Sequence, residues 1–452
     1  MSNSVVMKRK INAITTTKVM KRIIAMLTIA TASTVTMWAD TWSLDSCINY
    51  AVEHNLTVKT RQNDIESSKL SVTSAKSQLL PNVSASAGQS WSIGRGLTAE
   101  NTYANRNTSN TQWGASFTLP VFNGLSTVRQ IQLAKANLST VIEQYAAAKD
   151  DITLNVITAY LQVLYNRELH EVALNQVELS SYELTRQRAL LEAGKIPEVD
   201  LLEAESQLAQ DKLQATTTAN DTRLALVDLA QLLELDDIDN FDITTLDGEE
   251  QPILPAESVY NNALNINHTL KAARGEIAAA ERNISVAQSG YIPRLSFNAG
   301  IGSSYYTVTG MEHPSFSRQM KDNFNTYFGF SLSIPIFDGL STRNSVKRAR
   351  VQHVASKLQY QDAENRLYKT IQQAYYQAVS AQERSKSCLI AEDAANKAFE
   401  AMREKYNLGR ATPSEYEQAK NKALRTTAER IQAHYELILR TRILNFYDTG
   451  RY

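Results

Sequence analysis

Four segments of the chain alternate between apolar and small polar residues, a pattern typical of β-strands with two unlike faces. In segment 83–93, apolar residues such as Val83 and Trp91 are separated by serine and glycine. Similar alternation runs over 112–119, 295–307 and 326–334. The polar stretches 98–111 and 309–325 lie between the strands of each pair and predict surface loops. The sequence therefore predicts two pairs of strands, each strand with one apolar and one polar face.

Long segments without internal proline surround the strand pairs and favour helix. The expected helices cover 44–79, 125–192 and 198–233 in the first half of the chain, and 257–289, 340–408 and 414–446 in the second half. With a rise of about 1.5 Å per residue, each of the two longest helices spans on the order of 100 Å. Globular helices are rarely so long, and this length favours a coiled-coil or tubular assembly.

An internal repeat relates the two halves of the chain. Segment 116–127 recurs as 331–342, so that Pro120 corresponds to Pro335, and Pro81 likewise corresponds to Pro293. We assign 40–246 to the first repeat and 247–452 to the second, with an acidic connector at 235–255. The four prolines mark the expected junctions between strands and helices, because proline interrupts both elements.

The N-terminal segment 1–39 is expected to be a secretory signal with its core at 20–39. A charged Met20-Lys21-Arg22 precedes an apolar run that ends at Ala39, which predicts a mature start near Asp40. After residue 39 no apolar run reaches 18 residues, so no spanning helix is expected and the strands must cross any membrane as a β-barrel. Residues 44–47 are similar to a lipoprotein box, but a helical Cys47 is the favoured interpretation.

Composition argues against several classes of protein. Lys+Arg and Asp+Glu both number 47, so nothing indicates nucleic-acid binding. The distant Cys47 and Cys388 have no metal-site spacing, the histidines form no i, i+3 or i, i+4 pair, and hydrolase and phosphate-loop motifs are absent from the sequence. We expect no enzymatic activity, no cofactor and no metal.

Four strands cannot close a barrel alone, since single-chain barrels begin at about eight strands. The strands therefore predict a barrel shared among copies of the chain, and two to four copies are geometrically acceptable. Its interior would be neutral and would discriminate weakly by charge. The alternatives are a soluble β-sandwich or two hairpins that cap a helical bundle.

The turns that follow the two longest helices are the second candidate site. Gly194 and Gly409 stand where each helix is expected to end, and proline follows within four residues, which is ordinary helix-stop chemistry. Six residues after each glycine lies a carboxylate, Asp200 or Glu415. An acidic residue in a first helical turn is favourable in itself, so a structural and a functional role both remain open.

The ordered, duplicated pattern resembles the TolC family of outer-membrane efflux proteins. The likeness rests on 44–55, Leu80-Pro81, 119–124, 194–200 and the second-repeat segments 334–339 and 406–415. It implies a mainly α fold with a membrane β-barrel, in which a homotrimer embedded in outer-membrane lipid shares twelve strands and continues as a twelve-helix periplasmic tube. It also implies docking on a periplasmic adaptor (membrane fusion) protein and on an inner-membrane pump or ABC transporter.

In this family the turn tips form the closed periplasmic mouth and contact the adaptor. The resemblance implies that Tyr406 and Asp200 can hydrogen-bond to hold the mouth shut. Ala411 stands where the family's best-known member has an arginine that forms a second closing contact, which puts that contact in question here. An acidic ring that narrows the mouth falls on Glu415 and Gln418, of which only Glu415 is acidic.

The expected function is therefore that of an outer-membrane channel subunit in a tripartite efflux or type I secretion system. The channel would be a passive exit duct for small molecules or proteins, opened by the adaptor at the tips around Gly194 and Gly409. The alternative is a periplasmic coiled-coil adaptor or structural protein without a membrane barrel. The duplicated strand pair argues against this alternative, because an adaptor has no such strands.

Overall fold

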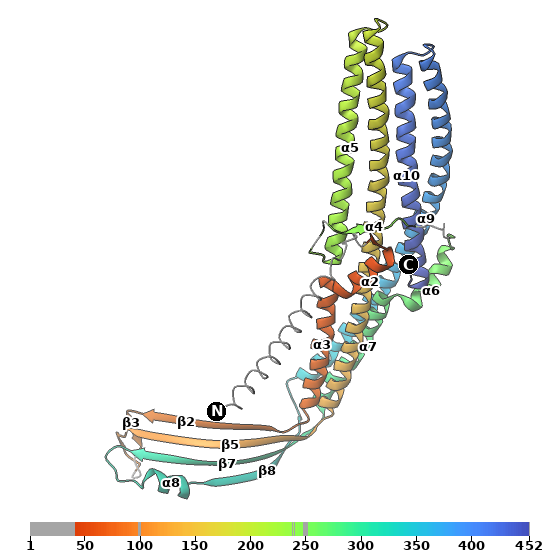
Figure 1. Cartoon of the computed structure of the whole chain (residues 1–452). Helices are drawn as coiled ribbons and strands as arrows, with labels where there is room; N and C mark the ends of the chain where they lie inside the picture. The colour runs from red at the N-terminus through yellow and green to blue at the C-terminus, as the bar shows by residue number, and fades with distance from the viewer. Residues whose placement is uncertain (1–40, 98–100, 237, 239, 247–251, 452) are drawn as a thin grey trace, which may run out of the picture.

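Two helices of 67 residues each, α4 (Ser126–Glu192) and α9 (Ser341–Asn407), form the frame of the protein. The computed structural model describes residues 41–97, 101–236, 238, 240–246 and 252–451. The expected signal segment 1–39 and part of the expected connector lie outside these residues. Each long helix runs from the β-sheet at one end of the molecule to a tight turn at the other end (Figure 1).

Shorter helices cover successive lengths of the two long ones. Beyond the middle of the molecule, α5 (Glu198–Leu233) returns along α4 and α10 (Pro413–Thr449) returns along α9, giving two helical hairpins that stand side by side (Figure 1). Nearer the sheet, α3 (Leu56–Ser77) packs on α4, and α7 (His268–Gln288) packs between α4 and α9. The long helices are thus supported along their whole length.

The expected single helices over 44–79 and 257–289 are each broken in two, which corrects the prediction. The structure has α2 (Leu44–His54) before α3, and α6 (Ala256–Ile266) before α7. Asn55 and Asn267 lie at the breaks, and their side chains accept the backbone N–H of Thr57 and Leu270. Asparagine competes for backbone hydrogen bonds in this way, so it ends one helix and caps the next. A short 3₁₀ turn, η1 (Ser289–Tyr291), then ends α7.

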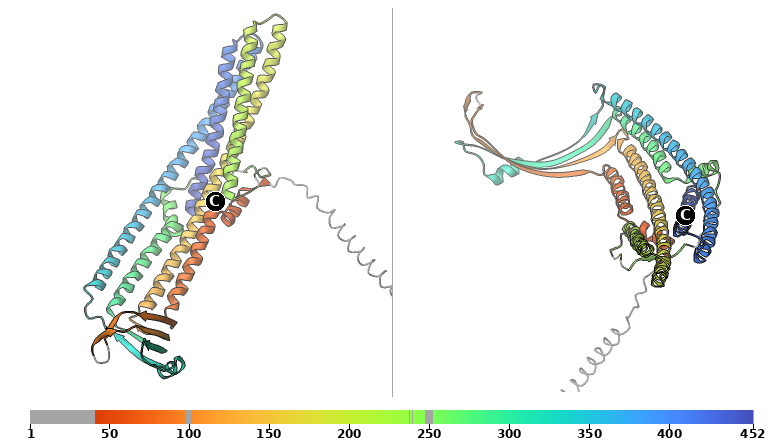
Figure 2. Two further views of the ribbon diagram at one scale, coloured as in Figure 1. Left: turned by 90° about the vertical axis from the view of Figure 1, so that its left-hand side faces the viewer. Right: turned by 90° about the horizontal axis from the view of Figure 1, so that it is seen from above.

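The four main strands form one antiparallel sheet in the order β2-β5-β7-β8. They are β2 (Asn82–Ser92), β5 (Thr108–Asn123), β7 (Arg294–Val308) and β8 (Asn325–Ser333). The pairing of β5 with β7 joins the two repeats, and the sheet projects from the helices as a curved blade (Figure 2). Since β2 and β8 each have one neighbour in this sheet, both outer edges of the blade are open.

The two faces of the sheet differ in chemistry as the alternation predicts. Val83 lies opposite Phe117, and Phe297 lies opposite Phe330, so these apolar side chains share one face. The Phe297 ring contacts those of Phe117 and Phe330, with centroids 6.1 and 5.2 Å apart. On the other face, Ser84 and Ser116 form a hydrogen bond of 2.8 Å between their hydroxyls. We call these the apolar face and the polar face.

The expected loops contain more structure than the sequence indicates. Strand β5 begins at Thr108 and not at 112, because its early residues pair with both β2 and β7. The preceding connection holds a small hairpin of β3 (Arg95–Leu97) and β4 (Tyr103–Asn105). The second connection holds a short helix, α8 (Phe316–Asp322), beside β7. Polar composition therefore failed to distinguish these ordered elements from loops.

A buried core lies at the level where α2, α4 and α5 meet. Two short parallel strands, β1 (Thr41–Trp42) and β6 (Asp242–Ile243), cover this core, and the Tyr160 hydroxyl donates a 2.7 Å hydrogen bond to the carbonyl of Thr244. Cys47 in α2 is 0% exposed, and burial raises the pKa of its thiol to about 12. In this structure Cys47 is therefore a core residue of a helix. A second cluster packs α6 and α7 on α9 through Val259, Leu270 and Ile371.

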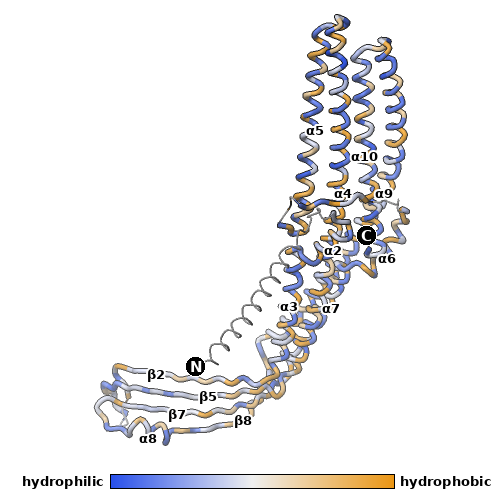
Figure 3. Tube along the Cα trace, viewed as in Figure 1, coloured by the Kyte–Doolittle hydropathy of each residue, from blue (hydrophilic) through white to orange (hydrophobic). Residues whose placement is uncertain are grey.

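Hydrophilic and hydrophobic residues are interspersed along the helices of the structure (Figure 3). Within the described ranges, no helix combines the length and the apolar character needed to cross a membrane.

Candidate functional site

The turns at the two hairpin tips have the same backbone geometry. Gly194 and Gly409 adopt the left-handed conformation, with φ of 68° and 69°. After Gly194, the backbone N–H of Lys195 donates to the carbonyl of Leu190 at 2.9 Å, and after Gly409, Arg410 donates to Lys405 at 2.8 Å. This is the glycine-ended helix C-terminus, in which a residue without Cβ takes the left-handed position. The duplicated glycines are explained by this conformational need.

The acidic residues after the two glycines have different surroundings. Glu415 accepts the backbone N–H of Thr412 at 2.8 Å, while its own N–H donates to the Thr412 hydroxyl at 3.3 Å. This capping box closes the start of α10, and its hydrogen bonds lower the pKa of Glu415 below the ordinary value. Helix α5 begins after Pro197 without a side-chain cap, so Asp200 is not part of a capping box as Glu415 is. Gln418 is exposed on α10.

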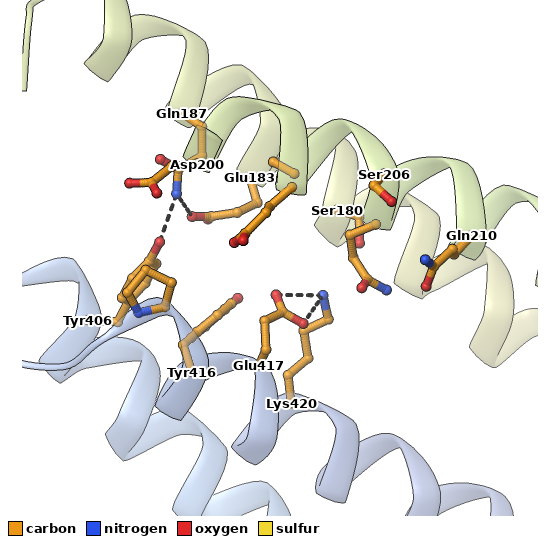
Figure 4. Close-up of a pocket in the computed structure, with 14 residues that line it drawn as sticks. Ser180, Glu183, Gln187, Asp200, Ser206, Gln210, Tyr406, Tyr416, Glu417 and Lys420 are labelled. Carbon is orange, nitrogen blue, oxygen red and sulfur yellow. Dashed lines mark hydrogen bonds and ion pairs between the residues drawn. The ribbon is translucent and has the colours of Figure 1, made fainter. Parts of the chain in front are cut away.

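A pocket of about 300 Å³ lies between the two hairpins just behind the tips (Figure 4). All four helices of the hairpins contribute to its wall. We call it the tip pocket, and its lining residues are Ser180, Glu183, Gln187, Asp200, Glu203, Ala204, Ser206, Gln207, Gln210, Tyr406, Pro413, Tyr416, Glu417 and Lys420. Tyr406 and Asp200 thus line the same pocket, whereas Glu415 and Gln418 are not among its lining residues.

Tyr406 connects the two hairpins near their tips. Its phenolic oxygen accepts a 2.7 Å hydrogen bond from the amide of Gln187 on α4 (Figure 4). Its ring lies 4.7 Å from that of Tyr416 in a stacked arrangement, and the Arg186 guanidinium lies 4.8 Å from the ring centroid. The family resemblance implied Asp200 as a partner of Tyr406. Gln187 is the residue that hydrogen-bonds to it in this structure.

Both tyrosines of the tip pocket keep their protons at physiological pH. Burial raises the pKa of Tyr406 above its ordinary value, and the nearby Glu183 carboxylate raises it further. Burial also raises the pKa of Tyr416, with Glu183 and Glu417 acting in the same direction. Neutral phenols can donate hydrogen bonds, so both hydroxyls are able to bind the carboxylates around them.

A buried lysine lies at the inner end of the tip pocket. The Lys420 side chain is 3% exposed, and its ammonium lies 3.2 Å from the carboxylate of Glu417 one helical turn earlier. A buried charge is costly unless it is paired, so this ion pair ties Glu417 to the pocket wall. Neither residue has a distinctive spacing in the sequence. Their place in the pocket follows from the packing of the two hairpins side by side.

The strand and helix junctions form a second group of candidate residues. Pro81 and Pro293 directly precede β2 and β7, and Pro335 follows β8 by two residues. Pro120 lies within β5, where the register with β7 shifts between Pro120 and Phe122, so the strand continues past the expected junction to Asn123. Proline has no backbone N–H to donate to a neighbouring strand, which accounts for the shift in register.

The junction turns that follow these strands are also duplicated. Gly124 and Gly339 have positive φ values, and so do the next residues, Leu125 and Leu340. A Cβ at position 124 would meet Ile292 at 2.8 Å, so the first of these turns needs glycine for space as well as conformation. Asp338 accepts the backbone N–H of Thr342 at 2.8 Å and caps α9.

In the parts of the chain covered by the structure, no cluster of three or more histidine, cysteine, aspartate or glutamate side chains could hold a metal ion.

Comparison with known proteins identifies the family. A family model described as outer membrane efflux protein matches residues 47–234 and 259–444. The chain belongs to the outer membrane efflux protein family. This confirms the resemblance to the TolC family that the duplicated sequence pattern indicated. The two matched ranges fall in the two repeats, on either side of the acidic segment.

Relatives of this outer membrane efflux protein include outer membrane protein TolC of Vibrio cholerae. It is 23% identical over 348 residues, which cover 75% of this chain and 74% of that protein. Outer membrane protein TolC of Escherichia coli is 23% identical over 361 residues, which cover 75% of this chain and 69% of that protein. The membership and these relatives establish an outer-membrane location and a channel of the efflux or secretion type.

Solved structures share the fold of this outer membrane efflux protein. A membrane protein from Pseudomonas aeruginosa superposes with a TM-score of 0.76 at 17% identity and covers 90% of both chains. The CmeC outer membrane channel of Campylobacter jejuni has a TM-score of 0.74 at 15% identity, covering 90% of this chain and 85% of that one. With this shared fold, the family match favours the channel over the alternative of a periplasmic adaptor.

Proposed function

We propose that three copies of this outer membrane efflux protein assemble into one passive exit duct for small molecules or proteins. The support is the open four-stranded sheet, in which β2 and β8 each leave one edge unpaired by the chain itself. Unpaired sheet edges are not tolerated in lipid, so β8 of one copy must pair with β2 of the next. Three copies give twelve strands, which is the number the family resemblance implies.

The two faces of the sheet fit opposite sides of a barrel wall. The apolar face, with Val83, Phe117, Phe297 and Phe330, suits contact with lipid. The polar face carries serine, glycine and asparagine, including the hydrogen-bonded Ser84 and Ser116, and suits a water-filled lumen. On this face of the four strands, Arg294 at the start of β7 is the one charged side chain, so a lumen beyond it would pass cargoes of different charge.

The helical hairpins would continue the duct into the periplasm, with their tips at the mouth. In this proposal the contacts in the tip pocket hold each pair of hairpins together and keep the mouth narrow. A periplasmic adaptor would bind the turns at Gly194 and Gly409, with Glu415 and Gln418 exposed beside the second turn, and would separate the hairpins. The observation that carries this proposal is the hydrogen bond between Gln187 and Tyr406, which links the two hairpins.

The proposed partners are therefore the adaptor and an inner-membrane pump or ABC transporter that supplies the energy. The duct itself would need no cofactor, because diffusion through an open channel requires only the opening of its mouth. Asp200 lies at the wall of the same pocket and is proposed to support the closed state, as the family resemblance implies.

The proposal is tested by purifying the full chain in detergent and measuring its mass and its conductance in a planar lipid bilayer. We expect particles of three chains and discrete ion-conducting events. Particles of one chain that conduct no ions would contradict the duct. Monomers that conduct would contradict the shared barrel.

A further inference from the structure

Helix α8 (Phe316–Asp322) lies in the connection between β7 and β8, at the end of the sheet remote from the helices (Figure 1). It is a seven-residue helix that the sequence pattern did not predict. The channel function described so far does not use it. Its contacts with the sheet and its exposed side chains indicate a role of its own.

Side chains of the α8 region complete the hydrogen bonding of β7 where β8 is absent. The ladder between β7 and β8 ends at Gly302 and Asn325. Beyond it, the Gln319 amide accepts the backbone N–H of Tyr306 at 3.0 Å and donates to the Tyr306 carbonyl at 3.0 Å. Asn323 donates to the carbonyl of Ser304 at 2.7 Å. The amides replace a strand partner, so α8 is fixed to the sheet.

The contacts of α8 also place it against the apolar face. Ser303 follows Phe297 at an even spacing, so both side chains point to that face. The Ser303 hydroxyl donates to the Met320 carbonyl at 2.7 Å. Beside it, the Phe324 ring lies 6.4 Å from that of Trp113, another residue of the apolar face. Helix α8 is therefore on the side of the sheet that the proposed barrel turns toward lipid.

The level of α8 along the strand matches the edge of a membrane. Ten residue steps separate Leu295 from Tyr305 in β7, about 34 Å along a strand at ~3.4 Å per residue. For a strand tilted by about 40°, this is about 26 Å along the membrane normal, close to the ~25 Å apolar band of such barrels. The ring of Phe316 contacts Tyr305 at 5.1 Å, so α8 begins where this band ends.

The outer surface of α8 combines aromatic and basic side chains. Phe316 in α8 is 53% exposed, and Phe324, two residues after the helix, is 52% exposed, although both lie beside other rings. Arg318 and Lys321 are exposed on α8, where the Arg318 guanidinium lies 3.6 Å from the carboxylate of Asp322. Phenylalanine is common on the apolar side of helices that lie in the membrane interface, and long basic side chains extend toward phosphate groups there.

We propose that α8 is an interfacial anchor, which lies among the phosphate-bearing lipid headgroups of the outer leaflet and fixes the depth of the barrel. The proposal rests on the barrel described under Proposed function. The occupant is lipid and not a neighbouring chain, because the α8 region lies on the apolar face and leaves Phe316 and Phe324 about half exposed. Ser317 is exposed on α8 and is free of the contacts described above, which makes it a suitable probe position.

The test measures the depth of a nitroxide label at Ser317→Cys in the full chain. Cys388→Ser removes one native thiol, while Cys47 is fully buried and stays unlabelled. Reference labels are placed at Phe328→Cys on the apolar face, opposite Ala299 and about midway between Leu295 and Tyr305, and at Ser414→Cys in the exposed first turn of α10. The protein is reconstituted into vesicles of phosphatidylethanolamine and phosphatidylglycerol, and collisions with oxygen and with a water-soluble nickel chelate are measured.

We expect the Ser317 label to collide with both probes at rates between those of the two references, at a depth within about 10 Å of the headgroup boundary. Adding Phe324→Ser should shift the label toward water. Nickel accessibility equal to that of Ser414, or protection from both probes by a neighbouring chain, would overturn the anchor alone. A Phe328 label as accessible to nickel as the Ser414 label would overturn the barrel and the anchor together.

Discussion

The amide of Gln187 and the phenolic oxygen of Tyr406 are 2.7 Å apart, although 219 positions separate them in the chain. Gln187 belongs to the hairpin of the first repeat, and Tyr406 belongs to that of the second. The hydrogen bond therefore connects the two repeats close to the tips. Around it, the stacked ring of Tyr416 and the paired Lys420 fill the same pocket.

The buried lysine gives a first prediction about the stability of the tip pocket. In Lys420→Met the ammonium is lost, and the carboxylate of Glu417 keeps its partial burial without its 3.2 Å partner. We expect the free energy of unfolding to fall by about 1–3 kcal/mol, because a half-buried charge is left unpaired. Thermal unfolding followed by circular dichroism measures the change.

A matched control for this prediction is Lys397→Met, since Lys397 is 75% exposed and pairs with Asp393 at 2.7 Å. An exposed pair contributes little, so this variant should unfold near the wild-type temperature. Adding Glu417→Gln to Lys420→Met should recover much of the lost stability. If Lys420→Met and Lys397→Met unfold at the same temperature, the ion pair between Lys420 and Glu417 does not stabilise the fold.

The tip glycines give a second prediction. Gly194→Ala and Gly409→Ala put a Cβ into the left-handed conformation, which costs about 1–2 kcal/mol for most residues. A Cβ at either position meets no atom within 4 Å, so the cost comes from conformation and not from collision. Gly409→Asn should lose less stability, because asparagine adopts this conformation more readily. Equal unfolding temperatures for the alanine and asparagine variants would contradict this explanation.

Asp150 on α4 gives a prediction about pH. Burial raises the pKa of its carboxyl to about 6, and Asp151 raises it as well, whereas His268 and Lys271 act in the opposite direction. The folded protein therefore binds this proton more tightly than the unfolded chain does, whose aspartates have a pKa of about 4. The fold is favoured while Asp150 is protonated, and stability is lost as pH rises from about 4 to about 6.

Asp150→Asn should therefore raise the free energy of unfolding at pH 7 by on the order of 1–2 kcal/mol, a figure that allows for solvent screening at a partly exposed site. At pH 4 the substitution should change this free energy little. Unfolding temperatures of both proteins across this pH range measure the effect. Asp393→Asn, at an exposed position on α9, is the control, and its unfolding temperature should change with pH as that of the wild type does. If the unfolding temperature of Asp150→Asn also changed with pH as that of the wild type does, the raised pKa of Asp150 would be contradicted.

Sequence patterns predicted the elements of the fold well where a periodic signal was present. The alternation around Phe117 and Phe330 is visible in the sequence because each strand has two chemically different faces. The breaks at Asn55 and Asn267 were missed, since one asparagine in a long helical pattern is a weak signal until its side chain caps a backbone N–H. Helix α8 was missed because Gln319 finds its partners only when β7 extends beyond β8.

The tip pocket was only partly predictable for a similar reason. Gly194 and Gly409 stand out because their conformation is local and duplicated. Tyr406 and Asp200 came from family resemblance, and the structure brings both to one pocket. Gln187 is an ordinary polar residue on a helix of 67 residues, and nothing in its neighbours along the chain marks it. Contacts between two hairpins depend on helix packing, which spacing along one chain does not encode.

The central claim is that contacts in the tip pocket keep the channel mouth narrow. The most direct test is single-channel conductance in planar bilayers of a variant that combines Tyr406→Phe with Gln187→Ala, and of one that combines Tyr406→Phe with Asp200→Ala. Tyr182→Phe is the matched control, because Tyr182 is an exposed tyrosine on α4 and is not among the residues that line the tip pocket. We predict that conductance rises above the wild-type value in both combined variants and stays at that value in the control. Wild-type conductance in all three would contradict the claim.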